Sequence, residues 1–517
     1  MPLPSFSSRL VLAASLLLSG APAALAQNTP STANRFVTDS LDSYIRRGMR
    51  LWQIPGLALV VVKDGKVVVQ KGYGVREVGK PEPVDANTLF MIASNTKLFT
   101  GTSLAKLDGE KKINLDDKVT KYLPDYRLYD SLASQMVTVR DLMSHHFGLK
   151  TFQGDFAFFK SNIERKEIVR RMRLMKPGGQ FRRDYGYSNS GFVTAGEVVP
   201  AATGGTSWEN YVQQNLLQPL GMTSTYTASA GFAQRPNIAY AYSNTFGPLA
   251  KVPFDNWDNM GPAANMVSNV TDLAKWLRFQ LDSGRYEGKQ IVPWAALRKT
   301  RDANTVITSR KSTIYPLHFI TYGLGVEAAD YNGKQIFWHT GGASGEVSNV
   351  CFVPEAGLGI AVLTNNDNQS FFEMLRYQLL DSYLGVPYVD RSTQAWKRKQ
   401  QFEATQVDPT KALAERVGKK NKPALPLSAY TGQFENKLFG PISISQKGKQ
   451  LLIQFPTHPG LTATLDYMDG QEFRTTYSDL VFGVMPAKFE VEGNKAKTVE
   501  LRVNDYVEYD PYVFGKR

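Results

Sequence analysis

The chain of 517 residues is too long for one ordinary domain and suggests two to four. Its hydrophobic fraction of 42%, with 28 Phe and 24 Tyr, excludes wholesale disorder and a fibrous chain. The single cysteine, Cys351, excludes an intramolecular disulfide, a zinc ribbon and an iron–sulfur cluster, and only five histidines are available for metal binding. The net charge of +13 leaves three interpretations open: nucleic-acid binding, an anionic envelope surface, or solubility.

Residues 1–26 have the pattern of a secretory signal peptide. Arg9 precedes an apolar run over residues 10–18, and Ala24-Leu25-Ala26 offers small residues at a cleavage site. The run is too short to span a bilayer, no cysteine follows it as a lipid attachment point, and no later run reaches eighteen apolar residues. We therefore expect a periplasmic or secreted protein with no membrane span, for which nucleic acid is not a partner.

Between residues 33 and 388 the pattern predicts an α/β domain. Two valine-rich runs flank Asp64-Gly65, a strong two-residue hairpin signal. Strands are predicted at both ends of the segment, with mixed helices and loops between them over 124–281, which suits one sheet with an inserted helical part. The expected helices cover residues 33–50, 95–107 and 371–384, and the expected strands cover 57–63, 66–69, 323–326, 335–338, 348–353 and 358–364.

The remaining third of the chain changes composition twice. Residues 389–425 form a basic linker, with nine basic and four acidic residues between Asp390 and Pro423. We interpret it as a solvated linker helix, with contact to an anionic surface as the alternative. Residues 426–517 read as a small all-β domain, a sandwich or a barrel. Its predicted strands include residues 441–445, 451–455, 480–484 and 498–503.

Several common catalytic motifs are missing from the sequence. There is no Gly-x-Ser-x-Gly elbow, no His-Glu-x-x-His motif and no phosphate-binding glycine-rich loop with Lys-Ser or Lys-Thr. His145 and His146 are adjacent, and adjacent side chains do not share one face of a helix. We interpret this pair as packing and hydrogen-bonding residues, with a catalytic or metal role as the alternative.

Two Ser-x-x-Lys motifs occur, about the number expected by chance, and their local context separates them. Ser94 follows the apolar residues 89–92 and stands where a helix begins, so free N–H groups and the helix dipole favour negative charge on its oxygen. Lys97 lies one turn further on the same face, within reach of the hydroxyl. A lysine with a lowered pKa can take the proton of a serine nucleophile. Ser103 and Lys106 lie inside the helix, where we expect a packing role.

Two further elements complete a candidate site. Tyr187-x-Asn189 stands at a predicted loop-to-helix junction, whereas Tyr242-x-Asn244 leads into an open loop, so we favour the first as a second proton-transfer group. His339-Thr340-Gly341-Gly342 follows an apolar strand, and an edge strand that ends in small residues lets a substrate backbone pair with it. The N–H groups of Gly342 and Ser94 are candidate donors of an oxyanion hole.

Together, Ser94-x-x-Lys97, Tyr187-x-Asn189 and His339-Thr340-Gly341 resemble the three motifs of penicillin-recognising serine hydrolases, the class C β-lactamase and DD-peptidase family. The resemblance extends from about Arg35 to Gly385. It implies an antiparallel sheet with helices and an inserted helical region, and hydrolysis through an acyl-enzyme on Ser94 without metal or cofactor. It also implies that Lys97 and Tyr187 transfer protons, while the substrate-binding residues are Asn189, His339, Thr340, Gly341 and Gly342.

The sequence departs from this family in ways that bear on the substrate. Many β-lactamases have lysine where this chain has His339. A histidine at this position resembles the sequences of certain secreted D-alanyl-D-alanine carboxypeptidases and of D-aminopeptidase- or esterase-like relatives. A basic cluster precedes Tyr187 in the sequence. It forms either a solvent-exposed face or a surface that attracts an anionic substrate. It comprises Arg170, Arg171, Arg173, Lys176, Arg182 and Arg183. The segment from about Leu427 resembles the lipocalin-like C-terminal domain of many relatives.

These observations leave three hypotheses about function. The first is an exported serine hydrolase that cleaves amide bonds of small substrates, D-amino-acid peptides or β-lactams. The second keeps the fold and makes the chain an esterase on small acyl esters. The third, a non-catalytic peptidoglycan-binding homologue, is disfavoured because Ser94, Lys97 and Tyr187 are all present. An anionic cell-envelope surface is the candidate macromolecular partner suggested by the basic charge.

Overall fold

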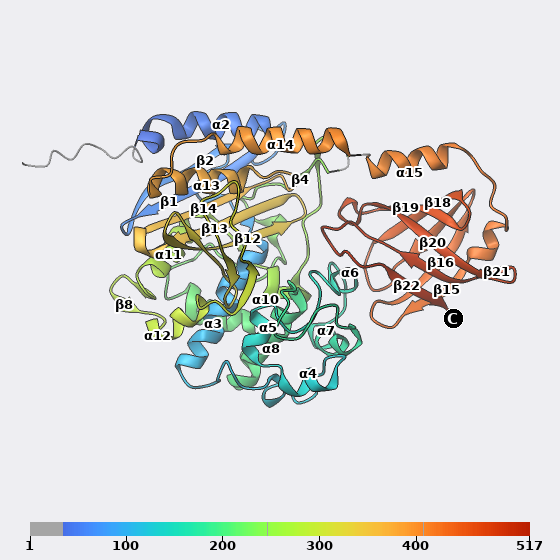
Figure 1. The fold of residues 1–517 in the computed structure, drawn as a ribbon, viewed down its shortest axis with the longest axis horizontal. Coiled ribbons are helices and arrows are strands. Elements are labelled where there is room, and N and C mark those ends of the chain that lie inside the picture. Colours follow the sequence, from blue (N-terminus) through green and yellow to red (C-terminus); the bar gives the residue numbers. More distant parts are fainter. Residues whose placement is uncertain (1–34, 246, 407) are drawn as a thin grey trace, which may run out of the picture.

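The computed structural model describes residues 35–245, 247–406 and 408–517 (Figure 1). The predicted signal peptide, residues 1–26, lies outside the described residues. None of the helices in the described part of the chain has both the length and the apolar character needed to cross a bilayer. A mixed domain with one large sheet is followed by two helices and a closed barrel (Figure 1).

The large sheet has eight strands, all paired antiparallel, and both ends of the hydrolase-like segment contribute to it, as predicted. The spatial order is β2-β1-β14-β13-β12-β11-β10-β9. The strands are β1 (Gly56–Lys63), β2 (Lys66–Gly74), β9 (Thr305–Thr308), β10 (Ile320–Tyr322), β11 (Glu327–Tyr331), β12 (Lys334–Ala343), β13 (Glu346–Val353) and β14 (Leu358–Thr364).

Strand β1 shows why helices must cover both faces of the sheet. Its apolar residues are buried throughout and alternate between two cores, because successive side chains point to opposite faces. Leu57, Leu59 and Val61 pack in one core with helix α2 (Leu41–Leu51) and helix α13 (Phe371–Leu384). Ala58, Val60 and Val62 pack in the other core with helix α11 (Val270–Leu281) and helix α3 (Thr96–Gly109).

The inserted part between β2 and β9 contains α3, α11 and several shorter helices below the sheet in Figure 1. Helix α8 (Asn189–Ala202) and helix α10 (Gly261–Ala264) pack against α3 and bring distant segments to its N-terminus. The other helices there are α4 (Ser131–Met136), α5 (Val139–Met143), α6 (Asp155–Phe158), α7 (Arg165–Arg171), α9 (Trp208–Val212) and α12 (Trp294–Leu297).

The predicted strand over residues 323–326 is wrong, because this segment is the connection between β10 and β11. Gly325 has φ +82°, a left-handed conformation that interrupts an extended strand. The connection also packs tightly against α3, where a Cβ on Gly101 would lie 2.0 Å from the Leu324 carbonyl oxygen. The apolar residues of the segment are therefore buried as a loop under the helix that carries the candidate lysine.

The C-terminal all-β domain is a closed barrel of eight strands, each paired with its neighbours in the sequence. The predicted strand at 480–484 is wrong for its first part, since Leu480–Phe482 forms a 3₁₀ turn. The strands are β15 (Gly432–Asn436), β16 (Gly440–Lys447), β17 (Gln450–Gln454), β18 (Thr462–Asp469), β19 (Glu472–Tyr477), β20 (Val484–Glu492), β21 (Lys495–Leu501) and β22 (Tyr512–Lys516).

Two helices occupy the basic segment that precedes the barrel. Helix α14 (Arg391–Thr405) packs on α13 and lies beside α2 (Figure 1). Helix α15 (Pro409–Gly418) packs on the barrel, where Arg416 forms ion pairs with Asp469 and Glu472. The two helices therefore each contact one of the domains that they connect.

The packing of α3 on the 323–326 connection predicts the effect of adding one methyl group. Gly101→Ala should lower the free energy of unfolding by about 1–3 kcal/mol, because the new Cβ would overlap the Leu324 carbonyl. Gly418→Ala, at the end of α15 with open space around its Cα, is the matched control and should be near neutral. Thermal unfolding followed by circular dichroism measures both, and equal melting temperatures for the two variants would contradict the prediction.

Candidate active site

Ser94 lies in a 3₁₀ turn, Ala93–Asn95, that leads from β3 (Phe90–Met91) into α3. The residues on both sides of Ser94 are buried, whereas Ser94 is half-buried and lines a cavity. Ala93 has φ +45°, a conformation that residues other than glycine rarely adopt and that clusters at functional sites. The turn therefore directs the Ser94 hydroxyl towards the cavity while the helix continues behind it.

Lys97 is fully buried one turn after Ser94, and its Nζ has three oxygen neighbours. Nζ is 3.1 Å from Ser94 Oγ, 2.7 Å from Asn189 Oδ1 and 2.9 Å from the carbonyl oxygen of Ala263. Burial lowers the pKa of Lys97 well below its ordinary value, although the Asp155 carboxylate acts in the opposite direction. A neutral amine donates two N–H groups to Asn189 and Ala263 and turns its lone pair to the Ser94 hydroxyl. That is the geometry of a general base.

The second Ser-x-x-Lys motif lies elsewhere in the structure. Ser103 is fully buried inside α3, and its hydroxyl has no hydrogen-bond partner among the described residues. Lys106 forms an ion pair with Glu110 and donates to the Ile291 carbonyl oxygen. Neither residue lines the cavity at Ser94, so the packing role expected from the sequence agrees with their positions.

The Tyr187 side chain completes the surroundings of the Ser94 hydroxyl. Its phenol lies beside Ser94 in the lining of the same cavity, and Lys97 Nζ lies 4.7 Å from the centre of its ring. Burial raises the pKa of Tyr187 well above its ordinary value, so the phenol keeps its proton at neutral pH. Tyr187 is therefore suited to donate or relay a proton and is not a ready tyrosinate base.

The alternative Tyr-x-Asn element makes different contacts. Tyr242 lies in β4 (Tyr242–Ser243), a short strand, and its hydroxyl accepts from the Val78 N–H. Asn244 donates to the Gln53 side-chain carbonyl at 2.9 Å. Tyr242 and Asn244 do not line the cavity at Ser94. The structure thus brings together Tyr187 and Asn189, not Tyr242 and Asn244, with Ser94 and Lys97.

Asp155 is a site residue that the sequence analysis missed. Asn189 Nδ2 donates to Asp155 Oδ2 at 2.6 Å, which turns the amide oxygen of Asn189 towards Lys97. Asp155 is 5% exposed and lines the cavity, and burial raises its pKa to about 7. It belongs to no motif, and only the apolar run over residues 156–159 after it indicates burial.

The end of β12 runs beside the turn that carries Ser94. Strand β11 pairs with β12 only as far as Trp338, so residues 339–343 have β13 on one side and leave the other side without a partner strand. The strand is thus an interior strand with a free end, not the edge strand expected from the sequence. A Cβ on Gly341 would lie 2.0 Å from the Ile92 carbonyl oxygen, so this close approach requires glycine.

His339 lies in β12 with both ring nitrogens engaged. Nδ1 is 2.7 Å from the Thr340 carbonyl oxygen, which can only accept, so Nδ1 carries the proton. Nε2 is 2.8 Å from the Tyr322 hydroxyl and accepts from it. Burial lowers the pKa of His339 to about 3. His339 is therefore neutral at physiological pH and supplies no positive charge to an anion.

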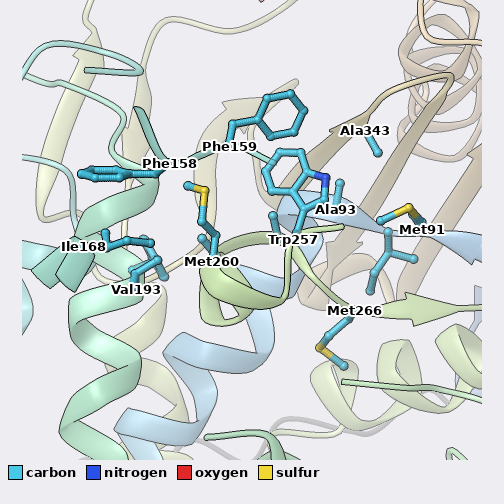
Figure 2. Close-up of a cluster of buried hydrophobic side chains, with 14 of the residues drawn as sticks. Met91, Ala93, Phe158, Phe159, Ile168, Val193, Trp257, Met260, Met266 and Ala343 are labelled. Carbon is cyan, nitrogen blue, oxygen red and sulfur yellow. The ribbon is translucent and has the colours of Figure 1, made fainter. Parts of the chain in front are cut away.

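The cavity at Ser94 has a volume of about 410 Å³ and is lined by both domains. Trp257 packs against Phe159 with ring centres 4.7 Å apart, and Met260 lies beside them (Figure 2). The described residues that line it are Ser94, Thr151, Phe152, Asp155, Phe159, Tyr185, Tyr187, Asn189, Trp257, Met260, Glu327, His339, Thr340, Gly342, Val347, Tyr506, Val507 and Tyr509.

The barrel contributes the wall formed by residues 506–509, between β21 and β22. The hydroxyl of Tyr506 lies 2.8 Å from the position of a Cβ on Gly342, so this side chain covers part of the free end of β12. The Tyr509 ring lies 5.8 Å from that of Phe152. Sequence reasoning could not find these residues, because they lie more than 400 positions from Ser94 and carry no motif.

Polar contacts fix this barrel segment to the hydrolase-like domain. Glu508 is buried, and its two carboxylate oxygens accept from the backbone N–H groups of Gly154 and Phe156 at 2.9 Å each. At the rim, Lys150 forms an ion pair with Asp510 at 2.9 Å. Glu508 therefore binds the backbone on both sides of Asp155.

The adjacent histidines and the basic cluster have structural partners outside the cavity. His145 Nδ1 accepts from the Ser188 N–H, and His146 pairs with Asp141 at 2.7 Å. Of the basic cluster, Arg170 and Arg171 pair with Glu167, and Arg182 pairs with Asp141. No member of the cluster lines the cavity, so these charges do not surround a substrate there.

Relatives of known sequence match most of the hydrolase-like domain. "Protein flp" of Staphylococcus aureus (strain COL) is 26% identical over 345 residues, which is 65% of this chain and 65% of that protein. The match thus spans slightly less than two thirds of that relative's length. "Unguisins hydrolase ungD'" of Aspergillus campestris (strain IBT 28561) is 27% identical over 421 residues, 77% of this chain and 76% of that protein.

Two solved structures share the fold. The octameric penicillin-binding protein homologue from Pyrococcus abyssi superposes with a TM-score of 0.58 at 22% identity, over 92% of this chain and 99% of that one. A D-stereospecific amidohydrolase from Streptomyces sp. superposes with a TM-score of 0.51 at 24% identity, over 65% of this chain and 94% of that one.

Family models divide the chain in the same way as the fold. A model described as "Domain of unknown function (DUF3471)" matches residues 417–516, which include the barrel. A model described as "Beta-lactamase" matches residues 41–383, which include the large sheet, Ser94, Lys97 and Tyr187. Since that match covers more than half of the sequence, the chain belongs to the Beta-lactamase family of serine hydrolases.

Proposed function

We propose that this protein is an exported serine hydrolase that forms an acyl-enzyme on Ser94 and cleaves amide bonds of D-amino-acid peptides or β-lactams. The observation that carries the proposal is the buried Nζ of Lys97, 3.1 Å from the half-buried hydroxyl of Ser94 in a cavity large enough for a small substrate. The Streptomyces protein that shares the fold is a D-stereospecific amidohydrolase, which supports amide hydrolysis.

The proposed reaction begins with proton transfer from Ser94 Oγ to the neutral Nζ of Lys97. Oγ attacks the substrate carbonyl carbon, and the carbonyl oxygen becomes an oxyanion. Tyr187 then protonates the leaving group and recovers a proton from the Lys97 ammonium, so the bond between carbonyl carbon and leaving group breaks. Water then attacks the acyl carbon while the same pair of residues takes its proton. The pair returns that proton to Ser94 Oγ as the bond between Oγ and the acyl carbon breaks, and a carboxylic acid leaves.

We further propose that the N–H groups of Ser94 and Gly342 stabilise the oxyanion, and that Thr340 and the glycines of β12 hold the substrate backbone. The unpaired end of β12 beside the turn of Ser94 supports this role. Asn189 holds Lys97 through its amide oxygen, 2.7 Å from Nζ. His339 contributes a neutral wall to this part of the cavity.

Three finer assignments belong to the same proposal. Within the family we place the chain near the class C β-lactamase and DD-peptidase group because of Tyr187-x-Asn189. Export rests on residues 1–26 as a signal peptide, and an anionic envelope surface is the partner that would suit the basic linker. The sequential order of eight strands in a closed barrel supports a lipocalin-like C-terminal domain.

The identity of the nucleophile can be tested by mass spectrometry after incubation with a penicillin, a D-Ala-D-Ala peptide or a p-nitrophenyl ester. We expect a covalent adduct in the wild type and in Ser103→Ala, the matched control from the second motif, but none in Ser94→Ala. An adduct that persists in Ser94→Ala, or no adduct with every donor, would overturn the proposal. Turnover of the ester alone would replace amide hydrolysis by an esterase function.

The general-base role of Lys97 predicts a loss of acylation without a loss of folding. Lys97→Met keeps the length of the side chain, but its thioether sulfur is too weak a base to take the Ser94 proton, so acylation should slow by about 100- to 10,000-fold. Lys106→Met is the control and should acylate at the wild-type rate. In the wild type, acylation should fall as the pH decreases, because the low pKa of Lys97 keeps it neutral only above that value. Stopped-flow acylation rates measure both effects, and a fast Lys97→Met would refute the role.

The contact between the barrel and the cavity predicts that Glu508 affects activity although it does not line the cavity itself. Glu508→Ala leaves the buried N–H groups of Gly154 and Phe156 without acceptors, a change that costs about 1–3 kcal/mol. We expect a lower melting temperature and a kcat/KM reduced by roughly tenfold or more, because Asp155 and the 506–509 wall lose their support. Asp505→Ala, exposed in the same segment, is the control. Wild-type kcat/KM in Glu508→Ala would show that the barrel is dispensable.

A further inference from the structure

The charge of the cavity is opposite to what a carboxylate-bearing substrate requires. Among the described residues that line it, none is a lysine or an arginine, whereas Asp155 and Glu327 are acidic. The position of β12 where a cation could meet a carboxylate is held by His339, whose ring is neutral and whose nitrogens are both engaged. Lys97 is fully buried beside Ser94 and does not line the cavity, and burial lowers its pKa well below the ordinary value.

Asp155 lines this cavity and has one buried carboxylate oxygen without a hydrogen-bond partner among the described residues. Its Oδ2 accepts from Asn189, but its Oδ1 is buried and has no hydrogen-bond partner among the described residues. A buried carboxylate is unfavourable unless it is paired or hydrogen-bonded, so an unpaired oxygen in a ligand cavity is an open position for a donor. Lys97 does not fill this position, because the amide of Asn189 stands between them.

The walls around Asp155 favour a cation over a neutral donor. Phe152 lies between Tyr187 and Tyr509, with ring centres 5.7 and 5.8 Å away, and all three rings line the cavity. Aromatic faces attract ammonium groups, and this attraction is stronger where water is excluded. Glu327, whose pKa burial raises to about 7, adds a second acidic group to the same cavity.

We infer that the cavity takes an amide substrate with a free ammonium group, and that the Asp155 carboxylate binds this group between the aromatic walls. The inference rests on the proposed serine-hydrolase function and names the class of substrate for that site. Among the proposed substrates it favours those with a free amino group near the scissile bond, such as amino-acid and peptide amides. It disfavours substrates that require a cation for a carboxylate.

A purely positional role for Asp155 makes a different prediction. If Asp155 only orients the Asn189 amide, its loss disturbs Lys97 and slows all substrates alike. If it binds ammonium, its loss affects only substrates that carry this group. Asp155→Asn separates the two roles, because an asparagine oxygen can still accept from Asn189 Nδ2 while the negative charge is removed.

The test compares D-alanine p-nitroanilide, which has a free ammonium group, with N-acetyl-D-alanine p-nitroanilide, which has none. We expect wild-type kcat/KM to be about 10- to 100-fold higher for the first substrate, because one charge-assisted hydrogen bond to a ligand contributes a difference of that size. In Asp155→Asn this ratio should fall towards one, mainly through a higher KM for the substrate with the free ammonium group. Asp184→Asn, an exposed carboxylate outside the cavity, should keep the wild-type ratio.

A binding measurement in a variant that lacks the nucleophile tests the ammonium site without relying on turnover. In Ser94→Ala, titration calorimetry should show D-alaninamide binding more tightly than N-acetyl-D-alaninamide, and the double variant with Asp155→Asn should lose the difference. Equal affinities in Ser94→Ala, or an unchanged ratio in Asp155→Asn, would overturn the inference but leave the acyl-enzyme standing. Preferred binding of D-alaninamide with no adduct on Ser94 from any donor would support the ammonium site and overturn the proposed function.

Discussion

The burial of Lys97 beside Ser94 is the constraint on which the rest of the site depends. An ammonium group is unfavourable in an apolar interior, so burial favours the neutral amine and makes its lone pair available. This requires a dense environment around Nζ, with oxygens placed for its remaining N–H groups. Helix α8 supplies Asn189 and helix α10 supplies the Ala263 carbonyl, from positions about 90 and 170 residues away.

The same requirement explains the close packing around the first turns of α3. The 323–326 connection passes under the helix at Gly101, and the end of β12 passes over the turn of Ser94 at Gly341. Both approaches leave no room for a Cβ. Glycines at these crossings thus allow two separate segments to pack closely against α3 and the turn before it.

The barrel extends this site to a second domain. Glu508 holds the backbone on both sides of Asp155, and Asp155 orients the Asn189 amide that holds Lys97. Hydrogen bonds, together with the backbone at Asp155, therefore connect the barrel to the Ser94 hydroxyl. The barrel also supplies the wall with Tyr506 and Tyr509, so one short segment both limits the cavity and supports its acidic group.

Local sequence determined the helices and strands whose apolar pattern is continuous. It also indicated the motif residues, because their chemistry requires them to act together. The strands at 57–63 and 358–364, the helix after Ser94 and the all-β C-terminal domain follow from patterning alone. Only the tertiary structure decided that residues 323–326 form a loop, that the all-β domain closes as a barrel and that Asp155 enters the cavity. These outcomes depend on long-range packing and on the loss of water around single groups, which no local pattern of residues encodes.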